Sequence, residues 1–380
     1  MKIAVIGSGL MGRAAVYDLS RVEGVKKIGL FDFDLELAEE IARKYGQEIT
    51  IAGRLDAGDE DHAASLLQEY DACISAVTYK YNPGLTRAAI KSATHFFDLG
   101  GNNDAVKAQF EMSEEARATD IVVIPDCGLA PGLVSILTAA GIAEFDKVKS
   151  VKIRVGGLPQ TPRPPLNYQM VFSSEGLINE YWEPVVILEN GEKKTVNPMT
   201  GLEELEFDGI GALEAFYTSA GTSTLPDTYK GIVEFLDYKT IRYPGHCQMF
   251  KPMLEIGLGS RSELKVGEIT VQPREVFKKV LEKNLGFNDP DLVLVRVTIE
   301  GESAGEAGKL VHEIIDRQDS RTGLTSMMRM TAFPVAIIAW MACSGKISHR
   351  GVVPQEVAVE PKFFMGQLKK RNINLVIRKE

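Results

Sequence analysis

The first third of the chain alternates short apolar runs with longer amphipathic stretches. The run at 2–7 (KIAVIG) predicts a buried strand, and the stretch at 10–22 (LMGRAAVYDLSRV) has apolar residues at helical spacing. The same alternation predicts strands at 26–32, 48–56, 71–77, 94–100 and 120–126, and helices at 35–46, 60–69, 83–92 and 104–118. Strands that alternate with helices indicate a parallel, doubly wound α/β sheet, so we predict a first domain over residues 1–126.

The pattern changes after one more helix, which we expect within 128–145. Later strand-like runs are separated by loops and indicate an open antiparallel or mixed sheet; they lie at 148–159, 183–191, 233–245 and 291–303. The proline-rich segment 159–168 (PQTPRPPLNY) cannot form a regular helix or a central strand. We therefore predict a second domain of α+β type over residues 127–324.

The C-terminal part begins with a stretch at 325–345 that is apolar on all sides. This pattern predicts a buried helix, which Pro334 either kinks or starts. Its most apolar run is shorter than a membrane span and is interrupted by the proline. We expect residues 325–380 to return to the first domain.

Three glycines carry the first chemical signal. Gly7, Gly9 and Gly12 have the spacing G-x-G-x-x-G, directly after a predicted strand and at the start of a predicted helix. In a Rossmann domain this spacing allows a tight turn, a close approach of the backbone to a pyrophosphate, and close packing of helix on strand. The first helical turn, with Leu10 and Met11, then offers free N–H groups to the phosphates. The alternative is a glycine-rich turn that binds no ligand.

Asp32 ends the second predicted strand, 20 residues beyond Gly12. A carboxylate at this position accepts hydrogen bonds from the ribose hydroxyls of NAD and repels the 2′-phosphate of NADP. Asp34 lies nearby, and no Arg or Lys follows immediately. The sequence therefore favours NAD as cofactor, with the alternative that Asp32 only caps the next helix.

Other candidates lie at the carboxyl ends of the remaining strands, where open α/β sheets bind their ligands. Asp56, after the third strand, contacts the adenine ring or only forms a turn. Residues expected on the nicotinamide side follow the fourth strand: Ala76, Val77 and Thr78. The loops after the fifth and sixth strands frame the expected reaction centre and carry Asp98, Gly100 and Asp126.

Composition narrows the class of protein. The chain has a net charge of −9 and no basic block, so nucleic acid and anionic membranes are poor partners. Four scattered cysteines and the absence of a signal-peptide pattern predict a cytoplasmic protein with reduced thiols. Five isolated histidines without a Cys/His cluster give no reason to expect a metal.

Several longer segments together resemble the saccharopine dehydrogenase/reductase-like family. In order they are DLGG (98–101), PDCGLAPG (125–132), PPLNY (164–168), FSSEGLI (172–178), EAFYTSAGTSTLP (214–226) and KTIRYPGH (239–246). The resemblance spans nearly the whole chain and is nearest to the lysine 6-dehydrogenases of the family. It implies a Rossmann domain, an inserted substrate domain with a mixed sheet, and assembly as a homodimer or a larger even oligomer.

The resemblance also implies an activity. Enzymes of this type oxidise the ε-amine carbon of L-lysine with NAD, release ammonia, and form an aldehyde that cyclises to piperideine-6-carboxylate. One rival within the fold is a saccharopine- or carboxynorspermidine-type imine reductase, whose substrate needs additional cations such as Arg154 and Arg163. A rival of another class is a regulatory protein that binds NAD without turnover.

Candidate residues for a lysine site gather around KTIRYPGH. Arg242 is the candidate for the α-carboxylate, because a guanidinium binds carboxylates bidentately, and the alternative is a structural ion pair. Tyr243 should point to the other face of its strand. His246 is a candidate base or water activator, or else it binds backbone at the Pro-Gly turn. Tyr168 is a further candidate catalytic group.

The remaining candidates have equally plain alternatives. Asp98 and Asp126 either hold the amine and orient water or cap loops. Thr222 and Ser223 either bind the substrate or the cofactor carboxamide, or form a turn.

Overall fold

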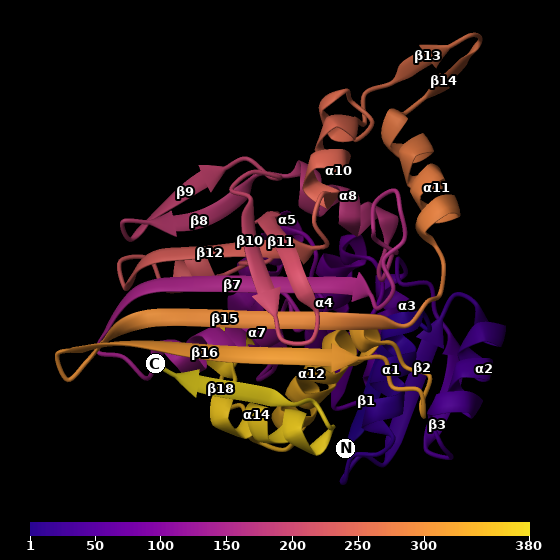
Figure 1. The fold of residues 1–380 in the computed structure, drawn as a ribbon. Coiled ribbons are helices and arrows are strands. Elements are labelled where there is room, and N and C mark those ends of the chain that lie inside the picture. The colour runs from indigo at the N-terminus through magenta and orange to yellow at the C-terminus, as the bar shows by residue number, and fades with distance from the viewer. The chain divides into compact units, whose positions relative to one another are not determined.

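A computed structural model describes all residues 1–380, which divide into two compact units. Unit 1 comprises Met1–Ala143 and Met328–Leu375, and unit 2 comprises Glu144–Met327 and Val376–Glu380 (Figure 1). The division differs from the predicted boundaries in two places. The helix after residue 128 belongs to unit 1, and the last strand of the chain belongs to the sheet of unit 2.

Unit 1 is built on a seven-stranded sheet with the order β17-β6-β5-β4-β1-β2-β3. All its strand pairs are parallel, which confirms the predicted doubly wound sheet. The strands are β1 (Lys2–Ile6), β2 (Lys27–Asp32), β3 (Thr50–Arg54), β4 (Ala72–Ser75), β5 (His95–Asp98), β6 (Val122–Ile124) and β17 (Gly351–Val352). The strand order reverses between β1 and β4, and open α/β sheets bind ligands at this switch point.

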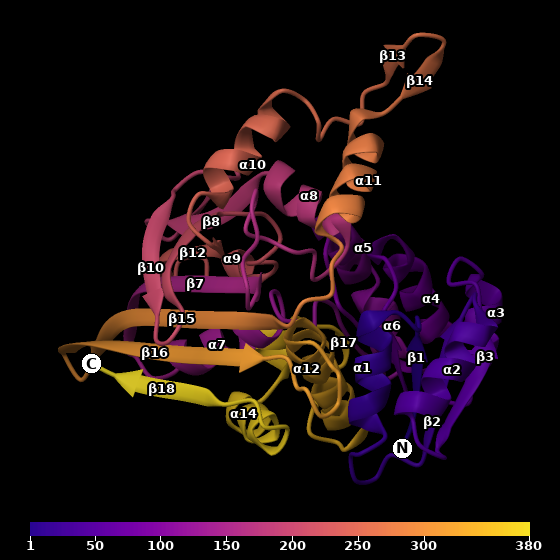
Figure 2. The same ribbon diagram turned by 45° about the vertical axis from the view of Figure 1, so that its right-hand side comes forward.

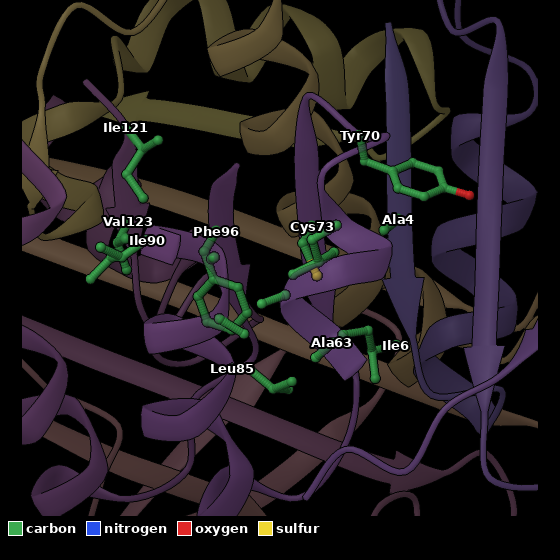
Figure 3. Close-up of a cluster of buried hydrophobic side chains, with 14 of the residues drawn as sticks. Ala4, Ile6, Ala63, Tyr70, Cys73, Leu85, Ile90, Phe96, Ile121 and Val123 are labelled. Carbon is green, nitrogen blue, oxygen red and sulfur yellow. The ribbon is translucent and has the colours of Figure 1, made fainter. Parts of the chain in front are cut away.

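Helices connect the strands of unit 1. They are α1 (Leu10–Leu19), α2 (Leu35–Tyr45), α3 (Glu60–Leu67), η1 (Tyr79–Tyr81), α4 (Asn82–Ser92), α5 (Asn103–Glu111), α6 (Ser113–Ala118) and α7 (Leu133–Ile142). The core lies where strand and helix side chains meet. Figure 3 shows Cys73 and Phe96 on the paired strands β4 and β5, close to Leu85 of α4. These side chains are fully buried, so the sheet holds its strand ends in fixed positions.

The C-terminal segment of unit 1 comprises α12 (Ser326–Cys343), β17, α13 (Gln355–Ala358) and α14 (Pro361–Lys370). α12 is the buried helix expected from the sequence, and it continues through Pro334. Its length and composition would allow a membrane span, but 83% of its apolar window is buried within the protein, as in an ordinary core helix. Arg371, which follows α14, binds Asp18 of α1 through two hydrogen bonds of 2.7 and 2.8 Å and so ties the end of the segment to the first helix.

Unit 2 contains a nine-stranded mixed sheet, as expected from the sequence. Its main path is β10-β11-β12-β7-β15-β16-β18, and β8 and β9 branch from β12. β12 and β7 pair in parallel, while β7, β15 and β16 run antiparallel side by side (Figure 1). The strands are β7 (Lys147–Pro159), β8 (Val185–Glu189), β9 (Glu192–Val196), β10 (Glu203–Phe207), β11 (Gly211–Tyr217), β12 (Val233–Arg242), β15 (Asp291–Ser303), β16 (Glu306–Arg317) and β18 (Leu375–Lys379).

Four helices accompany this sheet: α8 (Ser174–Trp182), α9 (Leu225–Thr228), α10 (His246–Glu255) and α11 (Pro273–Leu285). The residues between β7 and α8 form no regular element, as the prolines predicted. A hairpin of β13 (Leu264–Val266) and β14 (Ile269–Val271) extends from α10 and α11, away from the sheet of unit 2 (Figure 2). Residues of α8 and α10 pack with Tyr168 and Phe216 in one buried cluster, the aromatic cluster of unit 2.

Candidate functional site

The glycine turn of unit 1 is a close packing of three backbone segments. Gly7 has φ +107°, and its N–H donates to the carbonyl of Phe31 at 2.7 Å. A Cβ at Gly7 would lie 2.7 Å from the carbonyl oxygen of Ala76, and a Cβ at Gly12 would lie 1.7 Å from that of Gly7. Both positions therefore require glycine for the fold itself.

Gly9 differs from its two neighbours because it faces open space. A Cβ at Gly9 would meet no atom within 4 Å. The backbone of Gly9 is extended (φ −64°, ψ −166°), a conformation that residues other than glycine also adopt. Gly9 is the N-cap of α1, no side chain caps the helix, and its first turn holds no acidic residue. The N–H groups of Leu10, Met11 and Gly12 precede the first helical bond, which Arg13 makes to Gly9 at 3.1 Å. This arrangement fits a diphosphate at the helix N-terminus.

Asp32 lies beside the same turn. One carboxylate oxygen accepts from the N–H of Ser8 at 2.6 Å and the other from that of Asp34 at 3.1 Å. The alternative that Asp32 caps the next helix is wrong, because Asp34 caps α2 by accepting from Leu37 at 3.1 Å. Asp32 remains half-buried, so part of its carboxylate can receive a ligand.

The other predicted cofactor residues divide into two groups. Asp56 accepts from the N–H of Gly58 at 2.9 Å and thus forms the turn that was its alternative. Ala76 donates to the carbonyl of Ile6 at 2.8 Å, and with Val77 it lies against Gly7. Thr78 precedes η1. The segment after β4 therefore borders the glycine turn.

The loops after β5 and β6 are joined by one buried carboxylate. Asp98 is 0% exposed and accepts from Gly100 N–H at 2.7 Å, Asp126 N–H at 3.1 Å and Gln109 Nε2 at 2.7 Å. Burial raises the pKa of Asp98. Of its two predicted roles, the structure shows the loop cap, because the carboxylate is fully buried and three protein donors occupy its two oxygens.

Asp126 lies at the centre of the second loop. It has φ +61°, and a Cβ added to Gly100 would come within 1.7 Å of its carboxylate. Gln355 of α13 donates to the Asp126 carbonyl at 3.0 Å. The left-handed backbone and this contact hold Asp126 at the carboxyl edge of the sheet.

In unit 2, strand β12 separates two sets of side chains by its alternation. Arg242 faces the rings of Tyr168 and Tyr181, and Tyr238 lies on the same face of the strand, within electrostatic range of Arg242. Ile241 packs in a different buried cluster, which Tyr243 borders. Tyr243 donates its hydroxyl to the carbonyl of Pro159 at 2.8 Å. The prediction that Arg242 and Tyr243 point to opposite faces is confirmed.

Arg242 is a buried cation without a carboxylate partner. It is 2% exposed, its Nε donates to Tyr181 Oη at 2.7 Å, and its Nη1 donates to the carbonyl of Ile241 at 2.9 Å. Its guanidinium carbon lies 4.7 Å from the ring centre of Tyr168 and 5.6 Å from that of Tyr181. The alternative of a structural ion pair is therefore wrong for Arg242.

The two other arginines considered for a larger substrate are both paired. Arg154 binds Asp237 at 2.6 Å and also contacts Glu203, while Arg163 binds Asp289 at 2.6 Å.

His246 has no free nitrogen. Its Nδ1 lies 3.0 Å from the carbonyl of Leu166 and its Nε2 lies 3.2 Å from Tyr181 Oη. Because a carbonyl only accepts, Nδ1 carries the proton and Nε2 accepts from the tyrosine. Burial and the charge of Arg242 lower the pKa of His246 to about 3. His246 therefore orients Tyr181, and the backbone bond that was its alternative is present.

The neighbouring candidates are also fixed by the cluster. Tyr168 is 0% exposed, burial raises its pKa to about 12, and its ring packs on Arg242. Thr222 donates to the carbonyl of Val186 at 3.3 Å, and Ser223 has φ +42°. Thr222 and Ser223 thus belong to a turn, in agreement with their alternative.

Glu180 is a residue that the sequence reading missed. It precedes Tyr181 on α8, is half-buried, and interacts electrostatically with Arg242 without an ion-pair contact. Burial raises the pKa of Glu180 to about 7, against the opposing effect of Arg242. The signal in the sequence is an acid beside the apolar positions Leu177, Ile178 and Tyr181.

No group of three His, Cys, Asp or Glu side chains in the chain is arranged to hold a metal ion.

Comparison with known families covers nearly the whole chain. Residues 3–124 match the saccharopine dehydrogenase NADP binding domain, and residues 128–373 match the saccharopine dehydrogenase C-terminal domain. The chain belongs to the saccharopine dehydrogenase family. This confirms the family resemblance, and the matched binding domain indicates a nicotinamide cofactor.

Individual relatives within the saccharopine dehydrogenase family are distant. The mitochondrial alpha-aminoadipic semialdehyde synthase of Bos taurus is 26% identical over 278 residues, which are 68% of this chain and 28% of that protein. The chain thus spans little more than a quarter of this relative. Carboxyaminopropylagmatine dehydrogenase of Synechocystis sp. is 20% identical over 390 residues, covering 97% of this chain and 95% of that protein. Apo saccharopine dehydrogenase (L-Glu forming) of Saccharomyces cerevisiae shares the fold, with a TM-score of 0.82, 20% identity, and coverage of 100% and 99%.

The different surroundings of Gly9 and Gly12 give a test of the dinucleotide site. Gly9→Ala should leave thermal stability unchanged, because its Cβ meets no protein atom, but should weaken NAD(H) binding by about tenfold, or about 1.4 kcal/mol. Gly12→Ala should lower the melting temperature, because its Cβ would collide with Gly7. Binding is measured by fluorescence titration with NADH and stability by thermal denaturation. Undiminished NADH binding by Gly9→Ala would place the diphosphate elsewhere.

Proposed function

We propose that this protein is an NAD-dependent amine dehydrogenase that oxidises L-lysine at C6. C6 of lysine gives a hydride to NAD, and water adds to the resulting iminium carbon and displaces ammonia. The other products are NADH, a proton and 2-aminoadipate 6-semialdehyde, which cyclises to piperideine-6-carboxylate. The observation that carries the proposal is Arg242, a buried guanidinium that no carboxylate of the protein neutralises. A buried charge of this kind is stabilised when a ligand supplies the opposite charge.

The residues of unit 1 fit the cofactor. The first turn of α1 would hold the diphosphate, and the half-buried Asp32 would accept from the ribose hydroxyls. When bound, nicotinamide supplies the acceptor for the hydride of the substrate carbon. Asp32 also adds a negative charge where the 2′-phosphate of NADP would lie, and this supports NAD although the family model is that of an NADP-binding domain. Arg54 is opposite Asp32 in the register of β2 and β3, and it is exposed. Its positive charge is the feature of this site that would favour NADP instead.

The charges of unit 2 favour lysine over a larger substrate. Lysine has one carboxylate, and saccharopine has three. Of the three arginines considered for the larger substrate, Arg154 and Arg163 are already paired, which leaves Arg242 to bind one carboxylate. A planar guanidinium with free N–H groups binds that carboxylate in a defined orientation.

Oxidation at C6 also requires proton transfer, because a lysine ammonium has a pKa of about 10.4 in water. His246 is fully engaged in hydrogen bonds, and Asp98 is committed to its loops. We therefore propose Asp126 for the proton transfer at the reacting amine. Its left-handed backbone at the end of β6 is typical of residues held in place for function.

A second candidate is an imine reductase that joins an amine to a semialdehyde. The Synechocystis relative supports it, because the match covers nearly the full length of both chains. A panel assay at the NADH absorbance distinguishes the candidates. We expect turnover with NAD and free L-lysine. Reaction only with NAD(P)H, an amine and a semialdehyde would favour the reductase, and bound cofactor without turnover of any substrate would indicate a regulatory protein.

Replacement of Arg242 tests the carboxylate site. Arg242→Gln should reduce kcat/KM for lysine by about 100-fold, equivalent to about 2.7 kcal/mol, and should turn over lysine no better than cadaverine, which lacks the carboxylate. Arg163→Gln is the matched control, because this exposed arginine already pairs with Asp289. If the Arg242 variant folds and still prefers lysine to cadaverine, Arg242 does not bind the carboxylate.

Replacement of Asp32 tests the choice of cofactor. Asp32→Ser should weaken NAD binding by about tenfold and leave NADP binding unchanged or stronger, because the ribose acceptor and the repulsive charge are both lost. The control is Asp34→Ser, which removes an acid of the same loop that caps α2. Dissociation constants for both nucleotides give the ratio, and equal weakening of NAD and NADP would show that Asp32 does not contact the ribose.

A further inference from the structure

One face of β12 and one turn of α8 bring a buried cation and an acid to the same side of unit 2. Residues 238, 240 and 242 alternate onto one face of the strand, where Arg242 meets Tyr168 and Tyr181. Glu180 comes from the last turn of α8, and its own carbonyl accepts from Ser219 at 2.9 Å. Buried side chains hold β12 and α8 in place, so the backbone positions of Arg242 and Glu180 are fixed.

Neither charge is satisfied by the protein. Arg242 has five N–H donors and uses Nε and one N–H of Nη1. Glu180 receives no hydrogen bond and forms no ion pair, although its half-buried carboxylate is within electrostatic range of Arg242. A single ligand that carries one positive and one negative charge would satisfy both of these groups.

We propose that Arg242 and Glu180 together bind the α-amino acid end of the substrate, with the guanidinium on the α-carboxylate and Glu180 on the α-ammonium group. The proposal deepens the proposed function and rests on it for the identity of the reacting end. It restricts the substrate class to amino acids with a free α-amino group, and it leaves the distal amine as the group that reacts. Diamines, ω-amino acids and Nα-acylated amino acids each lack one of the two charges.

The groups around Glu180 keep a fixed charge near neutral pH. Burial raises the pKa of Tyr168, Tyr181 and Tyr238, so these hydroxyls stay neutral. Arg242 stays charged, and His246, with a pKa of about 3, stays neutral. Glu180, with a pKa of about 7, is therefore the group of this set that changes charge between pH 6 and 8.

The neighbouring loop holds the walls of this site in position. A Cβ at Gly221 would lie 2.3 Å from the ring of Tyr238, so the 218–224 turn packs directly on that ring. The hydroxyls of Thr218 and Thr240 are 2.7 Å apart and bridge β11's end to β12. Because the surrounding side chains are held rigidly, Arg242 and Glu180 keep a constant separation. A ligand then binds well only if its carboxylate and ammonium groups have a matching separation, as in an α-amino acid.

The test compares ligands that differ by one charge. Calorimetry on the full chain measures binding of L-lysine and of 6-aminohexanoate, which lacks the α-amino group. Glu180→Gln should weaken lysine binding by about 10- to 100-fold and leave 6-aminohexanoate unchanged. Glu255→Gln, an exposed acid at the end of α10, is the control and should change neither. Equal weakening of both ligands by Glu180→Gln, or no weakening of either, would overturn the proposal.

The wild-type protein gives an independent readout that needs no variant. Affinity for lysine should fall as pH is lowered through about 7, because the protonated Glu180 no longer attracts the α-ammonium, while affinity for 6-aminohexanoate should not show this step. Lysine affinity that is flat across this range would also contradict the proposal. Binding that depends on Glu180 without any turnover would leave this inference standing and defeat the proposed dehydrogenase activity.

Discussion

The burial of Arg242 is the constraint that organises the aromatic cluster of unit 2. Removing a guanidinium from water is unfavourable unless nearby groups compensate. Here the faces of Tyr168 and Tyr181, the Tyr181 hydroxyl and one carbonyl do so. The Tyr181 oxygen accepts from Arg242 and must therefore turn its own proton to His246 Nε2. A charged imidazole could not accept that proton, so the neutral state of His246 is part of the way the cation is held.

Acids withdrawn from water in unit 1 also need compensating groups, and backbone and side-chain N–H donors supply them. Asp98 meets three protein donors and has no oxygen left for a ligand. Asp32 also accepts from two backbone N–H groups, but it remains half-buried. Both acids end a parallel strand, so position alone does not separate them. The number of protein donors and the exposure of the carboxylate separate the structural acid from the one available to a ribose.

Periodicity and local geometry were sufficient for the features that depend on nearby residues. The parallel sheet, the glycine turn and the opposite directions of Arg242 and Tyr243 all follow from spacing along one element. The roles of His246 and Asp98 depend on partners far away in the sequence, such as Leu166 and Gln109, and no local pattern shows them. Strands such as β10 and β16 were missed because charged residues interrupt their apolar positions (EELEF and EAGKLVHEIIDR).

The cations of unit 2 differ in whether carboxylates of the protein already pair with them. Arg154 lies on β7 beside β12, and it would offer a second positive charge if Asp237 and Glu203 did not bind it. Lys239 also binds Glu203, at 2.6 Å, so the two acids and the two cations neutralise one another within the protein. A buried network of this kind contributes little net stability compared with apolar packing, but it removes those cations from the ligand. Of these arginines, Arg242 is the buried one that the protein has not paired, and the proposed single-carboxylate substrate matches that arrangement.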